Sequence, residues 1–255
     1  MKEQFIPGID NYCDRWCERC AFTSRCSTFK NANLSPGSDE VDIHNNALWE
    51  RVTENFQKTI QLLHQTAIKN GIDLKGTLAS NDEDDYEKRR LAVKKAAKNH
   101  RLTKLCNEYQ KIVMPFIKKP VDLDDKEREL KNYARLGIKA NKEIKEVMTG
   151  MDNSFDIIKW YLFFIGAKLQ RALHGKLEGE DMTSGNRFQK DSEGSAKITI
   201  IAIEKSITAW IRLYEIIPSI EDDALTALSL LSQLKKKTLE EFPQAMHFKR
   251  PGFDD

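Results

Sequence analysis

The chain has 255 residues, and its 41 Lys and Arg nearly balance its 39 Asp and Glu, for a net charge of +2. With 31% charged and 40% hydrophobic residues, the composition is that of a globular protein that can bury a sizeable core. The small net charge gives no support to a nucleic-acid or membrane partner, and whether the protein binds nucleic acid stays open.

No stretch of the sequence approaches the roughly 18 apolar residues that a membrane span needs. The amino-terminal sequence MKEQFIPGIDNYC also lacks the apolar run of a signal peptide. We therefore expect a cytoplasmic protein with no membrane partner. In that reducing compartment, an odd count of five cysteines argues against a disulfide framework and favours metal binding or redox chemistry.

Residues 1–40 form the first predicted region, a cysteine-rich, irregular metal-binding segment. Its four cysteines have the spacing C-x3-C-x2-C-x5-C and are Cys13, Cys17, Cys20 and Cys26. Four thiolates this close together can converge on one metal centre, and metal binding would supply the folding energy of a segment with little core of its own. These four residues are the predicted metal and cofactor ligands. No catalytic residue is assigned, and whether the protein is an enzyme stays open.

The spacing bears on the choice of metal. Structural zinc sites with four cysteines usually use two C-x2-C pairs separated by a dozen or more residues, whereas only one such pair occurs here. A short run of single cysteines wraps more naturally around the spread corners of a [4Fe-4S] cube. We expect a [4Fe-4S] cluster in a structural, redox-sensing or electron-transfer role, with a protein partner or electron donor. The alternative is a zinc-stapled helical interaction module without redox activity.

The stretch CERCAFTSRC resembles the C-x2-C-P-F-x3-C sequence of AddB-type and CRISPR-associated iron–sulfur nucleases. It is also similar to the end of the cluster loop in glycosylases of the endonuclease III type. The resemblance implies [4Fe-4S] ligand roles for Cys17, Cys20 and Cys26, with Cys13 as the fourth ligand. It covers about ten residues, and Ala21 stands where those families commonly have proline. The catalytic motifs of those families are missing from the sequence.

Two further resemblances concern the same segment. The whole pattern resembles an uncharacterised family of helical bacterial proteins with an N-terminal four-cysteine signature, which implies no function. CDRWCERC also has the C-x3-C-x2-C spacing of radical SAM enzymes. Against that reading, Arg19 stands where that family commonly has an aromatic residue, the family's chemistry is built on a βα barrel, and Cys26 offers a fourth ligand that would close the site.

Residues 41–241 form the second predicted region, an all-α bundle of about six helices, because apolar residues recur at spacings of three and four and no period-two alternation is sustained. We expect helices over 42–70, from Asp82 to before Pro120, and over 122–149, 153–174, 195–217 and from Ser219 to the lysines before Phe242. Gly71, Gly150, Gly175 and Pro218 are the expected stops. Ser219 and Asp222 have the spacing of a capping box.

The third predicted region is an irregular tail over 242–255. Three aromatic residues in it, Phe242, Phe248 and Phe253, predict that the tail packs against the bundle. Cys106 lies on an apolar helical stripe and is expected in the core, not as a fifth ligand. Lys168, Lys197, Glu204 and Lys205 lie in very apolar helices, where salt bridges at the helix edges are the expected explanation.

Overall fold

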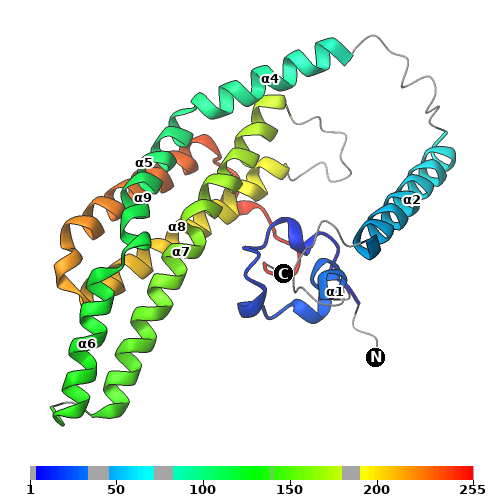
Figure 1. Ribbon diagram of the computed structural model, residues 1–255. Coiled ribbons are helices and arrows are strands. Elements are labelled where there is room, and N and C mark those ends of the chain that lie inside the picture. The colour runs from blue at the N-terminus through cyan, green and yellow to red at the C-terminus, as the bar shows by residue number, and fades with distance from the viewer. Residues whose placement is uncertain (1–3, 34–45, 72–82, 139, 180–189, 255) are drawn as a thin grey trace. The chain divides into compact units, whose positions relative to one another are not determined.

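The computed structural model describes residues 4–33, 46–71, 83–138, 140–179 and 190–254. Eight α-helices and no strand occur within these ranges, which confirms the all-α class (Figure 1). None of these helices is both long and apolar enough to cross a membrane. Backbone contacts divide the chain into two compact units, one of residues 1–5 and 23–90 and the other of residues 6–22 and 91–255.

The smaller unit contains helix α1 (Ser27–Asn33), helix α2 (Asn46–Lys69) and the first half of helix α4 (Glu83–Asn99). The helix predicted over 42–70 is confirmed from Asn46 onward, and residues 42–45 lie outside the described ranges. Gly71 follows it with a φ of 67°, and its N–H donates to the carbonyl of Ile68, as the predicted glycine stop requires.

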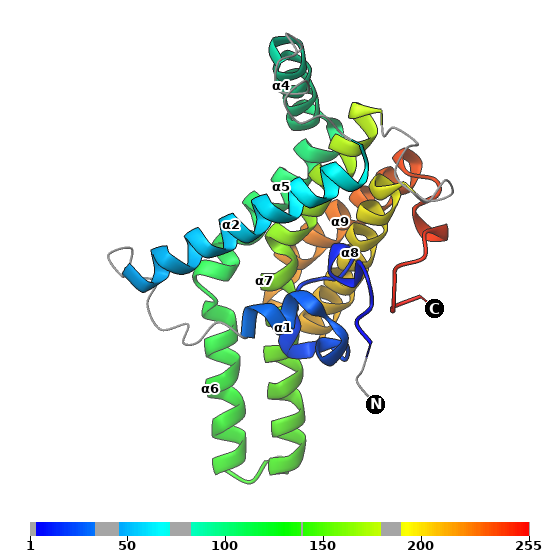
Figure 2. The same ribbon diagram turned by 90° about the vertical axis from the view of Figure 1, so that its right-hand side faces the viewer.

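The larger unit is a helical bundle whose elements are α5 (Arg101–Lys118), α6 (Val121–Arg135), α7 (Asn141–Glu178), α8 (Asp191–Ile216) and α9 (Glu221–Glu241). The long helices α7 and α8 pack along one another, α9 packs on α8 and α5, and α5 also packs on α7 (Figures 1 and 2). Helix α6 packs on α7. The run ITIIAI lies within α8, so its predicted helical state is confirmed.

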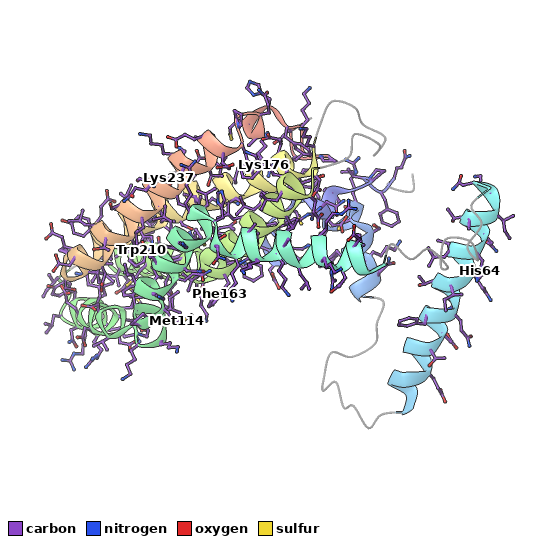
Figure 3. All side chains as sticks on the ribbon, turned by 90° about the horizontal axis from the view of Figure 1, so that it is seen from above. His64, Met114, Phe163, Lys176, Trp210 and Lys237 are labelled. Atoms are coloured by element: carbon purple, nitrogen blue, oxygen red, sulfur yellow. The ribbon has the colours of Figure 1, made fainter. Side chains whose placement is uncertain are left out.

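The core of the bundle forms between α5, α7, α8 and α9. Trp210, labelled in Figure 3, is fully buried there. Its indole N–H donates to the Tyr109 hydroxyl at 3.2 Å. Burial raises the pKa of Tyr109 well above its ordinary value, so the hydroxyl stays protonated at physiological pH. Cys106 is 2% exposed in the same core, which confirms its predicted place, and burial raises its pKa to about 12.

The predicted stops at Gly150 and Gly175 are wrong, and so is the single helix predicted from Asp82 to Pro120. Gly150 does not end a helix, because the predicted helices 122–149 and 153–174 are replaced by α6 and the continuous α7. The break lies at Gly137, whose φ of 68° and N–H bond to Ala134 end α6. The predicted helix from Asp82 to Pro120 is instead divided at His100, whose ring nitrogen accepts from the Leu102 N–H and caps α5.

The ends of the later helices differ in detail from the prediction. Helix α7 continues past Gly175 and ends before Gly179, whose φ is 65°. The capping box at α9 is wrong, because Ser219 donates its hydroxyl to Asp122 at 2.8 Å and no side chain caps the helix. Helix α8 ends at Ile216, before Pro218, as predicted.

The carboxyl-terminal tail packs on the bundle, as its aromatic residues predict. Phe242 and Phe248 are 1% and 6% exposed. The Phe248 ring lies over Gly194 of α8, where an added Cβ would stand 2.6 Å from it. Lys197 donates to the Phe248 carbonyl at 2.6 Å and pairs with Asp254 at 2.7 Å. These contacts fasten the tail to α8.

Candidate metal segment

Residues 6–22 belong to the same unit as the bundle and carry three of the four predicted ligands. The segment is built from short turns, a 3-10 turn at Ile9–Asn11 and another at Cys17–Arg19. Gly8 precedes the first turn with a φ of 73°, a conformation that glycine adopts without strain. Between the turns, Arg15 has a φ of 59°, a left-handed conformation that a residue with a side chain keeps only when its surroundings impose it.

Asp14 is the main anchor of this segment. Its Oδ2 accepts the hydroxyl of Tyr161 at 2.6 Å and the ammonium of Lys205 at 3.0 Å, which come from α7 and α8. Its backbone carbonyl accepts the indole N–H of Trp160 at 3.0 Å. Oδ1 accepts the N–H of Trp16 at 3.2 Å and so fixes the turn that leads to the second cysteine.

The ionisation of Asp14 follows from these contacts. Burial works against the carboxylate, but the hydrogen bonds from Tyr161 and Lys205 outweigh it, so the pKa of Asp14 lies below its usual value. The pKa of Tyr161 is raised well above its ordinary range by burial and by the neighbouring carboxylate. Asp14 therefore stays charged and Tyr161 stays a donor, which makes their short contact a charge-assisted hydrogen bond.

A second set of contacts holds the residues just before the first cysteine. The Tyr12 hydroxyl donates to Asp191 of α8 at 2.7 Å, and Arg171 of α7 binds the same carboxylate through two nitrogens. Lys168 donates to the backbone carbonyl of Asn11 at 2.9 Å. The Tyr12 ring lies on Gly194, where an added Cβ would stand 2.5 Å from it.

Aromatic stacking holds the residues around the second cysteine. The rings of Trp16 and Trp160 stack with centroids 4.9 Å apart and an interplanar angle of 17°. The guanidinium of Arg19 lies 3.7 Å above the Trp16 ring and pairs with Asp156 of α7 at 3.3 Å. Arg19 also donates to Asn153 of α7 at 2.5 Å. Residues 11–19 are thus fixed to α7 and α8 by side chains on both sides.

The four predicted ligands are partly buried and none is in a disulfide. Cys13 donates its thiol to the Asp10 carbonyl at 3.5 Å. The sulfur of Cys20 accepts the N–H of Phe22 at 3.4 Å. Cys26 belongs to the smaller unit, next to the start of α1, and its sulfur accepts the Phe29 N–H at 3.5 Å. Cys17 begins the second 3-10 turn, and the Cys20 N–H donates to its carbonyl at 3.1 Å.

The described residues do not include a group of three or more His, Cys, Asp or Glu side chains arranged to hold a metal ion. Preformed metal geometry is uncommon in small cysteine segments, because metal binding and folding are coupled. The donor set itself fits the predicted groups, since thiolates are the ligands of iron–sulfur clusters and of structural zinc. The ligand prediction therefore rests on residue type and spacing.

Two opposing effects act on the pKa of the Cys13 thiol. Burial raises the pKa of its thiol, whereas the Arg15 amide and the charges of Arg15 and Lys168 favour the thiolate. Burial also lowers the pKa of Lys168, with a contribution from neighbouring Arg171. Cationic side chains next to a thiol offset the negative charge that a metal–thiolate centre carries.

The predicted salt bridges are confirmed for three of the four polar residues in the apolar helices, and the fourth, Lys168, binds the backbone carbonyl of Asn11 instead. Lys197 pairs with Asp254, Glu204 with Lys235, and Lys205 with Asp14. Tyr161 was not identified from the sequence as a partner of Asp14. The one indication in the sequence was Asp14, a carboxylate between Cys13 and Arg15. It lies in a segment that has little core of its own and must be held by contacts with the bundle.

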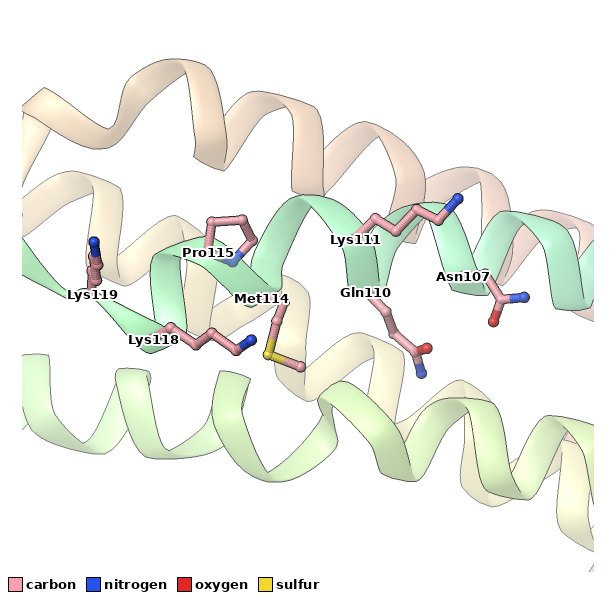
Figure 4. A pocket seen from close by; sticks show the side chains of 7 residues that line it. All are labelled: Asn107, Gln110, Lys111, Met114, Pro115, Lys118 and Lys119. Atoms are coloured by element: carbon pink, nitrogen blue, oxygen red, sulfur yellow. The ribbon is translucent and has the colours of Figure 1, made fainter.

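A separate hollow runs along the outer face of α5. Its lining consists of side chains of α5, among them Gln110, Met114 and Lys118, and of Lys119, which follows the helix (Figure 4). Gln110 donates to the carbonyl of Leu162 in α7. These side chains include no cysteine, histidine or carboxylate.

No protein family model, curated protein or solved structure has detectable similarity to this chain.

Proposed function

We propose that Cys13, Cys17, Cys20 and Cys26 bind a [4Fe-4S] cluster with a structural, redox-sensing or electron-transfer role, in the reducing environment of the cytoplasm. The observation that carries the proposal is the C-x3-C-x2-C-x5-C spacing, in a segment whose first three cysteines are anchored to a helical bundle. The local resemblance to cluster loops of iron–sulfur nucleases and glycosylases supports it.

The surroundings of the sulfurs support a thiolate centre. Backbone N–H groups donate to the sulfurs of Cys20 and Cys26, and such bonds stabilise bound thiolates and set a cluster's potential. Arg15 and Lys168 place positive charge near Cys13. The charge that four thiolates bring to a cluster would be partly offset there.

The anchoring by α7 and α8 also bears on the role. A bound cluster would supply one-electron redox chemistry or a structural link. Asp14 and Trp16 hold the chain on either side of Arg15, so contacts with α7 and α8 orient the backbone between Cys13 and Cys17. Because these residues are already held, metal binding has to order only the rest of the cysteine segment. The entropic cost of forming the site is lower for that reason. An electron donor or a protein partner would meet the cluster at this segment.

The proposal is tested by the metal content of protein purified without oxygen. We expect a broad absorption band near roughly 400 nm with about four irons and four sulfides per chain. Cys17→Ser should abolish the band, and Cys106→Ala is the matched control because that thiol is in the core. About one zinc per chain, with no colour, would favour the zinc-stapled interaction module instead. Metal-free protein, or equal loss of metal in both variants, would contradict both functions.

A further inference from the structure

An open hollow of about 600 Å³, which we call the α7–α8 hollow, lies on the surface between the first third of α7 and Arg212 of α8. It lies wholly within the larger unit. Its lining consists of Lys142, Lys145, Glu146, Thr149, Gly150, Asn153 and Arg212. This volume is within the range of small-molecule sites and exceeds what a bare ion needs.

Three cations surround the hollow without a neutralising partner. Within the part of the chain that the structure describes, neither Lys142, Lys145 nor Arg212 has a carboxylate within ion-pair distance. Other cations on the same two helices are paired, as Arg171 is with Asp191 and Lys205 with Asp14. Three cations without an ion-pair partner among the described residues therefore lie together at the hollow, whereas Lys159 and Lys168, the other cations of α7 with no such partner, lie outside it.

Gly150 explains how the arginine is positioned. A Cβ at this residue would stand 2.5 Å from Nη2 and 2.9 Å from Nε of Arg212, so the guanidinium lies directly against the α7 backbone. A Cβ here would push the guanidinium, the far end of an exposed side chain, away from this position. A glycine in the middle of a helix costs about 0.5–1 kcal/mol relative to alanine, and here the open space is filled by a cationic group.

The balance of charge defines the ligand. Three cations and the carboxylate of Glu146 leave a net charge of about +2 around the hollow. A phosphate monoester carries about −1.5 to −2 at pH 7 and accepts hydrogen bonds through three oxygens. A guanidinium binds such a group through two parallel N–H bonds. The Thr149 hydroxyl and the amide nitrogen of Asn153, whose side-chain oxygen accepts from Arg19, add polar groups at the same wall.

We propose that the α7–α8 hollow binds a small phosphorylated molecule, with Arg212, Lys142 and Lys145 around the phosphate. The proposal is independent of the metal segment, since none of the four cysteines lines the hollow. The room beyond the phosphate accommodates a small organic part.

The experiment is calorimetric titration of the full chain with ribose 5-phosphate and with inorganic phosphate, at constant ionic strength. We expect saturable binding of the ester that is tighter than that of phosphate, and at least a tenfold loss of affinity in Arg212→Gln. Gly150→Ala should also weaken binding, although it leaves the charge unchanged and improves helix propensity. Lys159→Gln is the matched control, because it removes one exposed charge from α7 outside the hollow.

Several results would overturn the proposal. If neither probe bound saturably, the hollow would not be a phosphate-binding site. Equal weakening by Lys159→Gln and Arg212→Gln would mean diffuse attraction by surface charge, the behaviour of a nucleic-acid surface. Equal affinity for phosphate and for ribose 5-phosphate would show that the hollow does not recognise the organic part of the molecule, which would contradict the proposal. Circular dichroism of each variant confirms that a lost affinity is not a lost fold.

Discussion

The hydrogen bond between Tyr161 and Asp14 gives the sharpest test of how the metal segment is held. Tyr161→Phe removes one hydroxyl that donates to a partly buried carboxylate at 2.6 Å, with no change in charge or ring packing. Hydrogen bonds to charged groups contribute about 1.5–3 kcal/mol, and we expect the variant to lose about 1.5–2 kcal/mol. The Lys205 ammonium, which is half exposed, contributes less, because water screens the ion pair.

The lost free energy weakens the packing of residues 11–19 on α7 and α8 and not the folding of the whole bundle. The assay must therefore detect the local detachment of these residues. Trypsin cleavage after Arg15 or Arg19 requires the segment to leave α7 and α8, and its rate follows the population of the open form. A loss of 1.5–2 kcal/mol raises that population about 10- to 30-fold. Tyr161→Phe should therefore be cleaved about 10- to 30-fold faster than the wild type at native conditions.

The matched control is Tyr214→Phe, which removes an exposed hydroxyl that donates to Glu221 at 3.3 Å on the same unit. It should leave the cleavage rate unchanged. Asp14→Ala should accelerate cleavage more than Tyr161→Phe, because it leaves both Tyr161 and Lys205 without their acceptor. Equal rates for the wild type and Tyr161→Phe would refute the anchoring role of this hydrogen bond.

Three further predictions concern the bundle. Gly194→Ala should cost about 1–3 kcal/mol in urea unfolding despite better helix propensity, because its Cβ would meet Tyr12 at 2.5 Å and Phe248 at 2.6 Å; a stabilised variant would contradict this packing. Burial opposes ionisation of Asp254, but bonds from Arg250 and Lys197 outweigh it and lower its pKa, so its contribution is present above the unfolded pKa near about 4 and is lost as pH falls below that. Unfolding at a series of pH values should show a weaker acid dependence for Asp254→Asn than for the wild type, and identical curves would refute the assignment. Trp210→Ala should lower stability by about 3–5 kcal/mol, as for other large core truncations, and a loss below about 1 kcal/mol in urea unfolding would contradict its place in the core.

Much of the fold could be predicted because helix formation depends on local residues. The apolar spacing along α8 indicated a helix in spite of the β-branched run ITIIAI, and Gly71 and Pro218 marked helix ends. Gly150 failed as a stop for a physical reason: its missing Cβ serves a contact with Arg212 on another helix. Nothing in the residues near Gly150 distinguishes a glycine needed for positive φ from one needed for close packing.

The sequence by itself determined the candidate ligands, since the type and spacing of Cys13, Cys17, Cys20 and Cys26 are properties of a few consecutive turns. It also determined that Phe242 and Phe248 would be buried, because removing a large apolar side chain from water is favourable when it can pack on the bundle. Only the tertiary structure decided that Asp14 meets Tyr161, 147 positions away, and that Arg212 rests on Gly150. Such pairs depend on which faces of α7 and α8 turn toward each other and toward the segment, and local propensity does not encode that choice.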